Sequence, residues 1–357
     1  MNTAIKRILI VGAGPAGLSA AVELARHGFI PDVIEKKDKP SSLSRAVGIL
    51  PNTMKLLEPS GVALEIESQA VIVENIIFHK NAAPIAKVPV NLINERYMKL
   101  YSLAQDKTEA ILANKFADNG GSVSYQSELK NISQQNNKVL VHINGEQREY
   151  DLVIGADGTK STVRTLLNIE FKGYELEEDW SIADVTIHDD LIENNFKGFL
   201  KDNQRVVVMI PLEKHRLRII SNTKNALEEV PVDLNVREIK REGRFTISIR
   251  QAEKYRKENV FLVGDAAHSH SPVGGRGMNL GIADAIDLAG RIINGHLDKY
   301  HEARYKIGKK TIFFTERARK SILSKNRMRK EVFFFLLKLM SKYNCLNKFF
   351  IRRVFSL

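Results

Sequence analysis

Runs of branched aliphatic residues alternate along the chain with glycine-rich turns and helical patterns, which is typical of an α/β protein. Residues 5–11 have the composition of a short buried strand. The turn Gly12-Ala-Gly-Pro-Ala-Gly17 follows, and residues 18–25 then show a helical pattern. A second aliphatic stretch covers residues 31–35. The pattern predicts a unit of strand, tight turn, helix and strand.

The same arrangement of an aliphatic strand and a polar turn occurs twice more. Residues 150–158 indicate a strand and a turn, followed by a helix that Ser161 is expected to cap. Residues 259–265 indicate another strand and turn, followed by a glycine-rich loop and a helix over residues 278–289. All three units therefore read as a buried strand that runs into a polar or glycine turn.

Between these units lie β-branched or alternating stretches separated by Asn, Asp, Gly and Pro, which predict antiparallel strands. These stretches are residues 182–187, 197–200, 205–210, 217–220 and 245–249. Together with residues near 70–100 they predict a second sheet laid across the first part, with a substrate pocket between the two.

Each glycine of the first turn stands where a nucleotide-binding turn requires one. Gly12 permits a tight turn, Gly14 lets a pyrophosphate approach the backbone, and Gly17 lets the helix lie close to the sheet. Glu35 ends the second strand, where a carboxylate accepts hydrogen bonds from ribose hydroxyls. The motif predicts a dinucleotide site but does not distinguish FAD from NAD(P). The residues predicted to form it are Gly12, Gly14, Ala16, Gly17, Glu35 and Lys36.

Composition and charge remove several classes of function. The 357 residues are 43% hydrophobic and 27% charged, without the apolar run of roughly 20 residues that spans a membrane. The net charge of +12 is local, because fifteen Lys and Arg stand against two acids from Lys306 to Leu357 and the preceding 305 residues carry a net −1. A nearly neutral body without a nucleic-acid-binding motif argues against nucleic acid as a partner.

Cysteine and histidine usage gives further expectations. The single cysteine, Cys345, excludes an intramolecular disulfide and a cysteine-based metal cluster. His268 and His270 have no third ligand placed beside them, so no metal site is predicted. His268 is expected to be a packed residue of its turn. The sequence begins without a signal-peptide pattern, so a cytoplasmic protein is expected.

Taken in order, the three motifs resemble those of the single-component flavin monooxygenases of the para-hydroxybenzoate hydroxylase type, over roughly residues 5–305. The resemblance implies FAD as cofactor, and NAD(P)H and O₂ as co-substrates, with no separate Rossmann domain for the nicotinamide. It also implies hydroxylation of a small apolar, aromatic or polycyclic molecule through a flavin C4a-hydroperoxide. No side-chain acid or base is predicted, since this chemistry belongs to the cofactor.

The resemblance also implies roles for individual residues. Asp157 corresponds to a residue near the pyrophosphate and the nicotinamide route, and Asp265 to one that holds the ribityl chain. Arg45 and Gln105 match residues that reach the flavin phosphates or ribityl. The loop expected to lie against the isoalloxazine ring contributes Pro272, Gly275, Gly277, Met278 and Asn279. Met209 and Pro211 match a strand that faces the flavin and are predicted to line the substrate pocket.

The predicted organisation is a Rossmann-like FAD-binding domain, an antiparallel substrate domain and C-terminal helices. The first takes residues 1–75, 100–175 and 255–305, the second residues 76–99 and 176–254, and the basic helical segment residues 306–357. That basic segment is expected to pack its Phe/Leu face on the body, and a peripheral contact with anionic lipid is the alternative.

Three other functions share parts of this pattern. A flavin-dependent reductase or dehydrogenase of an isoprenoid or quinone-like substrate is the main alternative, and it would consume no oxygen. A halogenase would need a Trp-x-Trp-x-Ile-Pro signature, but Trp180 is the only tryptophan. A non-enzymatic FAD-binding protein would leave an intact cofactor site unused.

Overall fold

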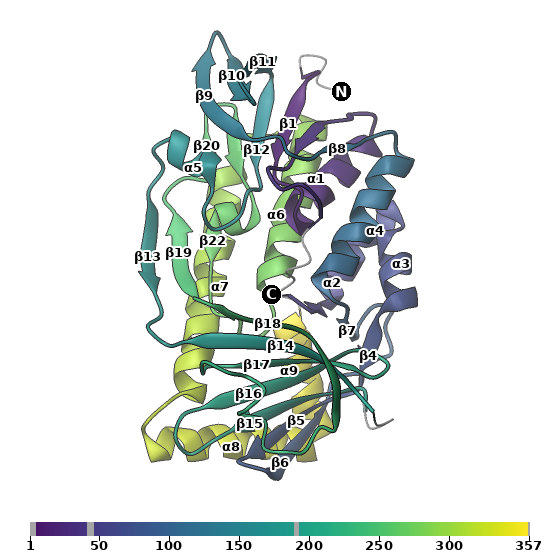
Figure 1. Cartoon of the computed structure of the whole chain (residues 1–357), viewed down its shortest axis with the longest axis vertical. Helices are drawn as coiled ribbons and strands as arrows, with labels where there is room; N and C mark the ends of the chain where they lie inside the picture. Colours follow the sequence, from purple (N-terminus) through teal and green to yellow (C-terminus); the bar gives the residue numbers. More distant parts are fainter. Residues whose placement is uncertain (1–4, 41–45, 189–192, 356–357) are drawn as a thin grey trace.

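The computed structural model describes residues 5–40, 46–188 and 193–355 (Figure 1). In these ranges it has a six-stranded sheet, a seven-stranded sheet and three small three-stranded sheets, joined by helices. The six-stranded sheet lies in the upper part of Figure 1 and the seven-stranded sheet in the lower part. This arrangement confirms the predicted α/β class with a Rossmann-like part.

The six-stranded sheet has the order β20-β21-β12-β1-β2-β8. Its centre is parallel: β1 pairs with β12 and β2, β12 with β21, and β2 with β8. Every residue of β1 and β12 is buried, as expected for parallel strands covered on both faces. The bounds are β1 Ile8–Val11, β2 Asp32–Ile34, β8 Val123–Ser124, β12 Leu152–Gly155, β20 Arg256–Lys257 and β21 Val260–Leu262.

Helices cover this sheet and fix the direction of its turns. α1 (Pro15–Ala25) follows β1 directly, with Pro15 at the first helical position, where its missing N–H costs nothing. α1 packs between α6 (Gly277–Asn294) and α4 (Gln105–Asp118). The shorter elements around them are β3 Gly48–Ile49, α2 Pro51–Leu57, η1 Glu58–Ser60, α3 Val62–Gln69, β4 Val71–Val73 and β7 Leu100–Ser102.

The seven-stranded sheet has the order β18-β14-β17-β16-β15-β5-β6 and contains the strands predicted at 182–187, 197–200, 205–210 and 217–220. It is mixed and not purely antiparallel, because β15 pairs in parallel with β5. These two strands are far apart in sequence, and only neighbours joined by a hairpin must be antiparallel. The bounds are β5 Asn75–Lys80, β6 Ala83–Pro89, β14 Trp180–Ile187, β15 Asn195–Leu200, β16 Val206–Glu213, β17 Arg216–Ser221 and β18 Val236–Phe245.

One stretch that was predicted as a single strand belongs to two different strands. The stretch 245–249 is split between the end of β18 at Phe245 and β19 (Ser248–Ala252), which pairs with β13 (Phe171–Glu175) and β22 (His268–Ser269). Side-chain alternation continues through the split, so it does not reveal that the chain changes sheets. We therefore propose that the FAD-binding part resumes near Ser248 and not at residue 255; the other domain boundaries stay predictions.

The remaining elements flank the two sheets. They are β9 Leu129–Gln135, β10 Lys138–Ile143, β11 Glu146–Tyr150, α5 Thr162–Leu166, η2 Gly264–Ala266, α7 Tyr300–Ile322, α8 Arg327–Lys342 and α9 Asn344–Phe355. α7 runs along one side of both sheets, and α8 lies across the lower end of the molecule in Figure 1. No helix in the described ranges is long and apolar enough to cross a membrane.

Candidate functional site

The three predicted turns meet at the carboxyl edge of the parallel sheet. The N–H of Ala156 donates to the carbonyl of Val11 (2.8 Å), and the N–H of Val263 donates to the carbonyl of Gly155 (3.0 Å). β1, β12 and β21 therefore end side by side. In an open α/β sheet this edge is where ligands bind.

Glycines at this edge fall into two groups. A Cβ on Gly12 (φ +106°) would lie 2.5 Å from the carbonyl oxygen of Ala156, and one on Gly17 would lie 2.0 Å from that of Gly12. These two glycines are required by close backbone packing. A Cβ on Gly14 would meet no atom within 4 Å, and the same holds for Gly158, Gly275 and Gly277. The second group borders open space, which fits a phosphate and a flat ring approaching the backbone.

Glu35 lies against the first turn. Its Oε2 accepts a hydrogen bond from the N–H of Ala13 (3.2 Å), and its Oε1 accepts one from the N–H of Lys37 (3.1 Å). Lys36 is exposed beside it. The carboxylate is thus fixed at the end of β2 next to the glycine turn, and contact with a ribose stays a prediction for Glu35 and Lys36.

Asp157 is committed to the start of α5. Its carboxylate accepts from the Ser161 hydroxyl (2.5 Å) and from the N–H of Val163 (3.0 Å), while the Ser161 hydroxyl accepts from the N–H of Arg164 (3.0 Å). The Ser161 cap is therefore confirmed. Desolvation raises the pKa of Asp157, although these hydrogen bonds oppose the shift. The structure thus shows Asp157 fixing its turn, whereas a direct cofactor contact stays a prediction.

A buried charged network supports the third turn. The carboxylate of Asp284, which is fully buried on α6, accepts from the N–H of Gly264 (3.2 Å), Nε2 of His268 (2.5 Å) and Nε of Arg304 (2.6 Å). Burial alone would raise the pKa of Asp284, but the charges and hydrogen bonds of His268 and Arg304 outweigh it and lower that pKa. The network holds in place the turn that presents the exposed Asp265.

Sequence reasoning missed Asp284 and Arg304. The available signal was an acid inside the apolar stripe of a predicted helix, since its neighbours Ile282, Ala285 and Leu288 are all buried. His268 is packed as expected. Within the described ranges, no group of three His, Cys, Asp or Glu side chains is placed to hold a metal ion.

The loop between β22 and α6 turns tightly before the helix begins. The N–H of Gly275 donates to the carbonyl of Pro272 (3.0 Å), and Gly275 has a φ of +60°, which glycine adopts without strain. α6 begins at Gly277, so the first N–H groups of the helix, including that of Met278, have no partner within the helix. This positive helix end suits an anionic ring edge.

Asn279 ties this loop to the segment after β2. Its Oδ1 accepts from the N–H of Leu50 (2.8 Å) and the hydroxyl of Thr53 (2.7 Å), and its Nδ2 donates to the carbonyls of Gly48 (2.8 Å) and Gly275 (2.7 Å). An amide side chain has two donors and two acceptor positions, and all are used. Asn279 therefore positions the loop, and its side chain has no capacity left for a flavin.

Gln105 opens α4 as expected and supports the same segment. Its Oε1 accepts from the N–H of Ala46 (3.1 Å), and its Nε2 donates to Oε1 of Glu109 (2.8 Å). Arg45, the residue before Ala46, lies outside the described residues. A ribityl contact stays a prediction for both Gln105 and Arg45.

The seven-stranded sheet turns one apolar face toward this edge. Val208 and Ile210 of β16 pack with Val47 and Ala104 of the FAD-binding part. Met209 lies between them and points to the opposite face, where it is buried with Phe199. Since side chains alternate along a strand, Val208 and Ile210 face the FAD-binding part and Met209, which was predicted for the pocket, faces away from it.

Pro211 lies at the junction of the two parts, where its carbonyl accepts from the hydroxyl of Ser102 (2.5 Å). Close by, Arg218 and Asp184 form a fully buried ion pair with Nε to Oδ1 at 2.7 Å. Arg218 also donates to the carbonyl of Ala46 (3.3 Å) and so links the large sheet to the same segment that Gln105 holds. Sequence reasoning did not find this pair, because nothing local brings β14 and β17 together.

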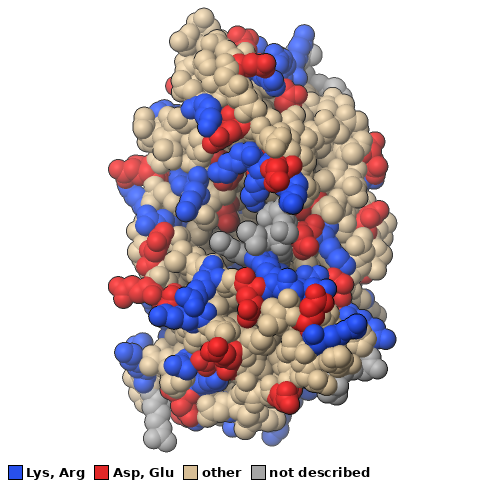
Figure 2. All heavy atoms as spheres, in the orientation of Figure 1, with Lys and Arg blue, Asp and Glu red and all other residues tan. Residues whose placement is uncertain are grey.

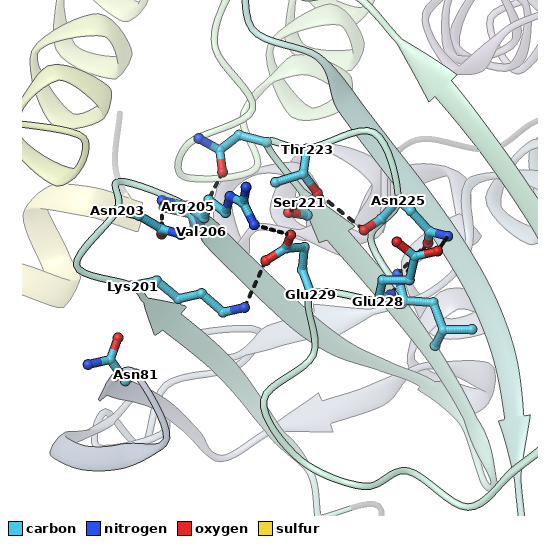
Figure 3. Close-up of polar contacts among 12 residues, drawn as sticks. Asn81, Lys201, Asn203, Arg205, Val206, Ser221, Thr223, Asn225, Glu228 and Glu229 are labelled. Carbon is cyan, nitrogen blue, oxygen red and sulfur yellow. Dashed lines mark hydrogen bonds and ion pairs between the residues drawn. The ribbon is translucent and has the colours of Figure 1, made fainter.

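The surface has a recess between the two parts of the molecule and separate cavities beside the large sheet. Figure 2 shows a recess between the two parts, with Lys and Arg side chains gathered around it. Two other cavities, of about 280 and 680 Å³, lie beside the loops of the large sheet and are lined largely by charged and polar residues. Glu229, which lines the larger cavity, binds Lys201 and Arg205, each at 2.7 Å (Figure 3). Such polar hollows do not suit an apolar substrate.

Comparison with known proteins agrees with the geometry at the sheet edge. The family model described as an FAD binding domain matches residues 6–315. The chain belongs to the FAD binding domain family. FAD is therefore the cofactor, and the residues at the carboxyl edge fit it, because their glycines leave open space where its phosphates and ring approach.

Characterised proteins similar to this member of the FAD binding domain family include monooxygenases. A rifampicin monooxygenase from Streptomyces venezuelae is 29% identical over 84% of this chain and 68% of its own length. A pentachlorophenol 4-monooxygenase from Sphingobium chlorophenolicum is 29% identical over 85% of this chain and 63% of its own length. The chain thus spans 63% to 68% of the length of these relatives.

Solved structures share the fold of this family member. A p-nitrophenol 4-monooxygenase from Pseudomonas putida has a TM-score of 0.87 at 21% identity and covers 97% of this chain and 96% of its own. An anhydrotetracycline hydroxylase from Streptomyces rimosus has a TM-score of 0.81 at 27% identity, over 98% of this chain and 76% of its own.

Proposed function

We propose that this protein is an FAD-dependent monooxygenase that hydroxylates a small apolar substrate, aromatic or polycyclic, with NAD(P)H and O₂. Two electrons come from the nicotinamide, one oxygen atom enters the substrate as a hydroxyl group, and the other leaves as water. The observation that supports it best is the meeting of three turns at one sheet edge, facing an apolar sheet. The names of the relatives agree with this reaction class.

The residues of the FAD-binding part would bind and orient the cofactor. The open space at Gly14 suits the pyrophosphate, Glu35 a ribose, and Asp265 the ribityl chain. The N–H groups at the start of α6 suit the pyrimidine edge of the ring, where negative charge develops on reduction. When bound and reduced, FAD supplies the activation of O₂ and the transfer of one oxygen atom.

The large sheet would hold the substrate and exclude water. Ile220 packs against both apolar groups on the face turned toward the FAD-binding part, one around Ile210 and one around Trp180. The two apolar groups therefore adjoin each other on this face, one including Val47 and the other including Ile312 of α7. An apolar lining of this kind favours a flat, weakly polar substrate and keeps water from the reacting centre.

The test is NADH and NADPH oxidation by the FAD-loaded protein in air, with hydrogen peroxide measured alongside. The panel contains phenols, quinone precursors and polycyclic aromatics. Oxidation that a substrate accelerates while peroxide stays low supports the proposal, and the product must gain one oxygen atom. Turnover of an isoprenoid or quinone-like substrate without oxygen consumption would replace it with a reductase.

If Val208 lines the pocket and Met209 does not, substitutions at these two neighbouring positions should affect substrate binding differently. Val208→Phe should raise the KM of the best panel substrate by about tenfold and increase the peroxide share, because the larger ring fills the apolar space. Met209→Leu should leave both values near those of the wild type, since Met209 packs on the other face. Equal effects of the two substitutions would contradict the assignment. FAD content should be unchanged in both.

A further inference from the structure

The outward face of α8 is apolar, although its inward face is already packed. Phe334 and Leu337 are buried against Ala86 of β6. Four large apolar side chains on the opposite side are 51–72% exposed: Met328, Val332, Phe335 and Leu336. Steps of three and four residues place side chains in one stripe along a helix. α8 therefore has a second apolar stripe whose side chains are more than half exposed.

α9 extends this exposed surface. Its inward side is fixed by Ile351, which is 2% exposed in a cluster with Leu50 and Val73. On other sides of the helix, Leu346 and Phe349 are 50% and 68% exposed. Both helices are anchored by buried residues, so their exposed apolar residues are not the result of loose packing. Neighbouring exposed apolar residues of this size mark a surface that meets another surface.

Basic side chains surround the apolar stripe. Lys338 and Lys342 follow Phe335 by three and seven residues and therefore flank it on α8, and Lys348 precedes Phe349 on α9. None of these three lysines makes an ion pair with another described residue. From Leu323 to Leu357 the sequence has nine Lys and Arg and a single acid, Glu331.

We propose that α8 and α9 dock this protein on an anionic lipid surface. Helices that lie on such surfaces place apolar and aromatic side chains at the boundary of headgroups and acyl chains, and lysines among the phosphates. A second copy of the chain fits less well, because a two-fold contact would bring the lysines of one copy close to the same lysines of the other, and like charges repel. α8 lies at the end of the molecule away from the six-stranded sheet (Figure 1).

The test is sedimentation of the full chain with phosphatidylcholine vesicles that contain or lack phosphatidylglycerol. We expect binding to the vesicles with phosphatidylglycerol and little binding to pure phosphatidylcholine, decreasing as salt is raised. Absence of binding to either vesicle would overturn the proposal. So would equal binding to both, because the lysines would then have no part.

A variant that removes charge tests the role of the three lysines beside the apolar stripe. The triple substitution Lys338→Gln, Lys342→Gln and Lys348→Gln should lower the partition coefficient by about 100-fold, at roughly fivefold per lysine. The matched control changes three exposed lysines elsewhere in the same way: Lys55, Lys254 and Lys299. It should stay within about threefold of the wild type. An equal loss in both variants would indicate a diffuse charge effect and no docking face.

A second pair of variants tests the apolar stripe. Phe335→Ser with Phe349→Ser should lower partition by on the order of 100-fold, whereas Ile30→Ser with Leu64→Ser, at positions 55% and 56% exposed, should not. All four positions are on the surface, so unchanged circular dichroism spectra are expected. A dimer that is lost in the phenylalanine variant, with no vesicle binding in the wild type, would replace the lipid by a second copy.

Discussion

The substitution Asp284→Asn should lower the free energy of unfolding of the protein by about 3–5 kcal/mol, and bound FAD should fall with it. The reason is that Asp284 is fully buried and serves three donors at once, on Gly264, His268 and Arg304. An amide in its place leaves the buried Arg304 charge without a counter-ion. Because Gly264 opens the turn that presents Asp265, weaker support there should also reduce FAD affinity.

The matched control is Asp287→Asn, one turn further along α6. Asp287 pairs with Arg291 (2.7 Å) near the surface, with the two side chains 31% and 22% exposed. A partly exposed pair contributes little, so the expected loss is below about 1 kcal/mol. Urea unfolding and FAD titration of both variants measure the effects. Similar losses would contradict the role assigned to the buried network.

The same residue predicts the direction of a pH effect. The folded-state pKa of Asp284 lies below its ordinary value of 3.8, because His268 and Arg304 outweigh the effect of burial. A depressed carboxylate pKa stabilises the protein fully above the unfolded-state value and loses that contribution as pH falls through the folded value. The carboxylate's contribution to the stability difference between wild type and Asp284→Asn should therefore shrink as the pH falls below about 4.

Local patterning explains why the three strand-and-turn motifs could be predicted from the sequence. Each of the three motifs contains its own strand, turn and helix start, and parallel strands with buried faces can only place such turns on one edge. Family resemblance then named the cofactor, which the family match confirms. The fold class follows from the same alternation of strand and helix patterns.

Features that depend on contacts between distant segments were not predictable. The amide of Asn279 is saturated by residues 48–53 and by Gly275, so its role changes from flavin contact to positioning only once these segments are together. Met209 was predicted for the pocket but lies on the opposite face from Val208, because sequence alternation gives the period of a strand and not which face meets the FAD-binding part. The parallel pairing of β5 with β15 could not be predicted either, because the two strands are far apart in the sequence and no local pattern indicates that they pair.

Adding a methyl group should have different effects at Gly14 and Gly17, because only Gly17 is closely packed against the backbone. We expect the substitution at Gly17 to reduce stability and the one at Gly14 to reduce FAD affinity. In Gly17→Ala the new Cβ would lie 2.0 Å from the carbonyl oxygen of Gly12 and 3.2 Å from the Cβ of Ala156. α1 would have to move off the sheet, and we expect a loss of about 3 kcal/mol or more in the free energy of unfolding. FAD binding should fall as a consequence of this instability.

In Gly14→Ala the methyl group meets no protein atom within 4 Å, and the φ of −78° is ordinary for alanine. Stability of the apoprotein should change by no more than about 0.5 kcal/mol. The FAD dissociation constant should nevertheless rise on the order of 100-fold, because the methyl group occupies the space through which the pyrophosphate approaches the backbone. Thermal unfolding of the apoproteins and fluorescence titration with FAD separate the two effects. Wild-type FAD affinity in Gly14→Ala would mean that the open space beside the first turn is not where the phosphates bind.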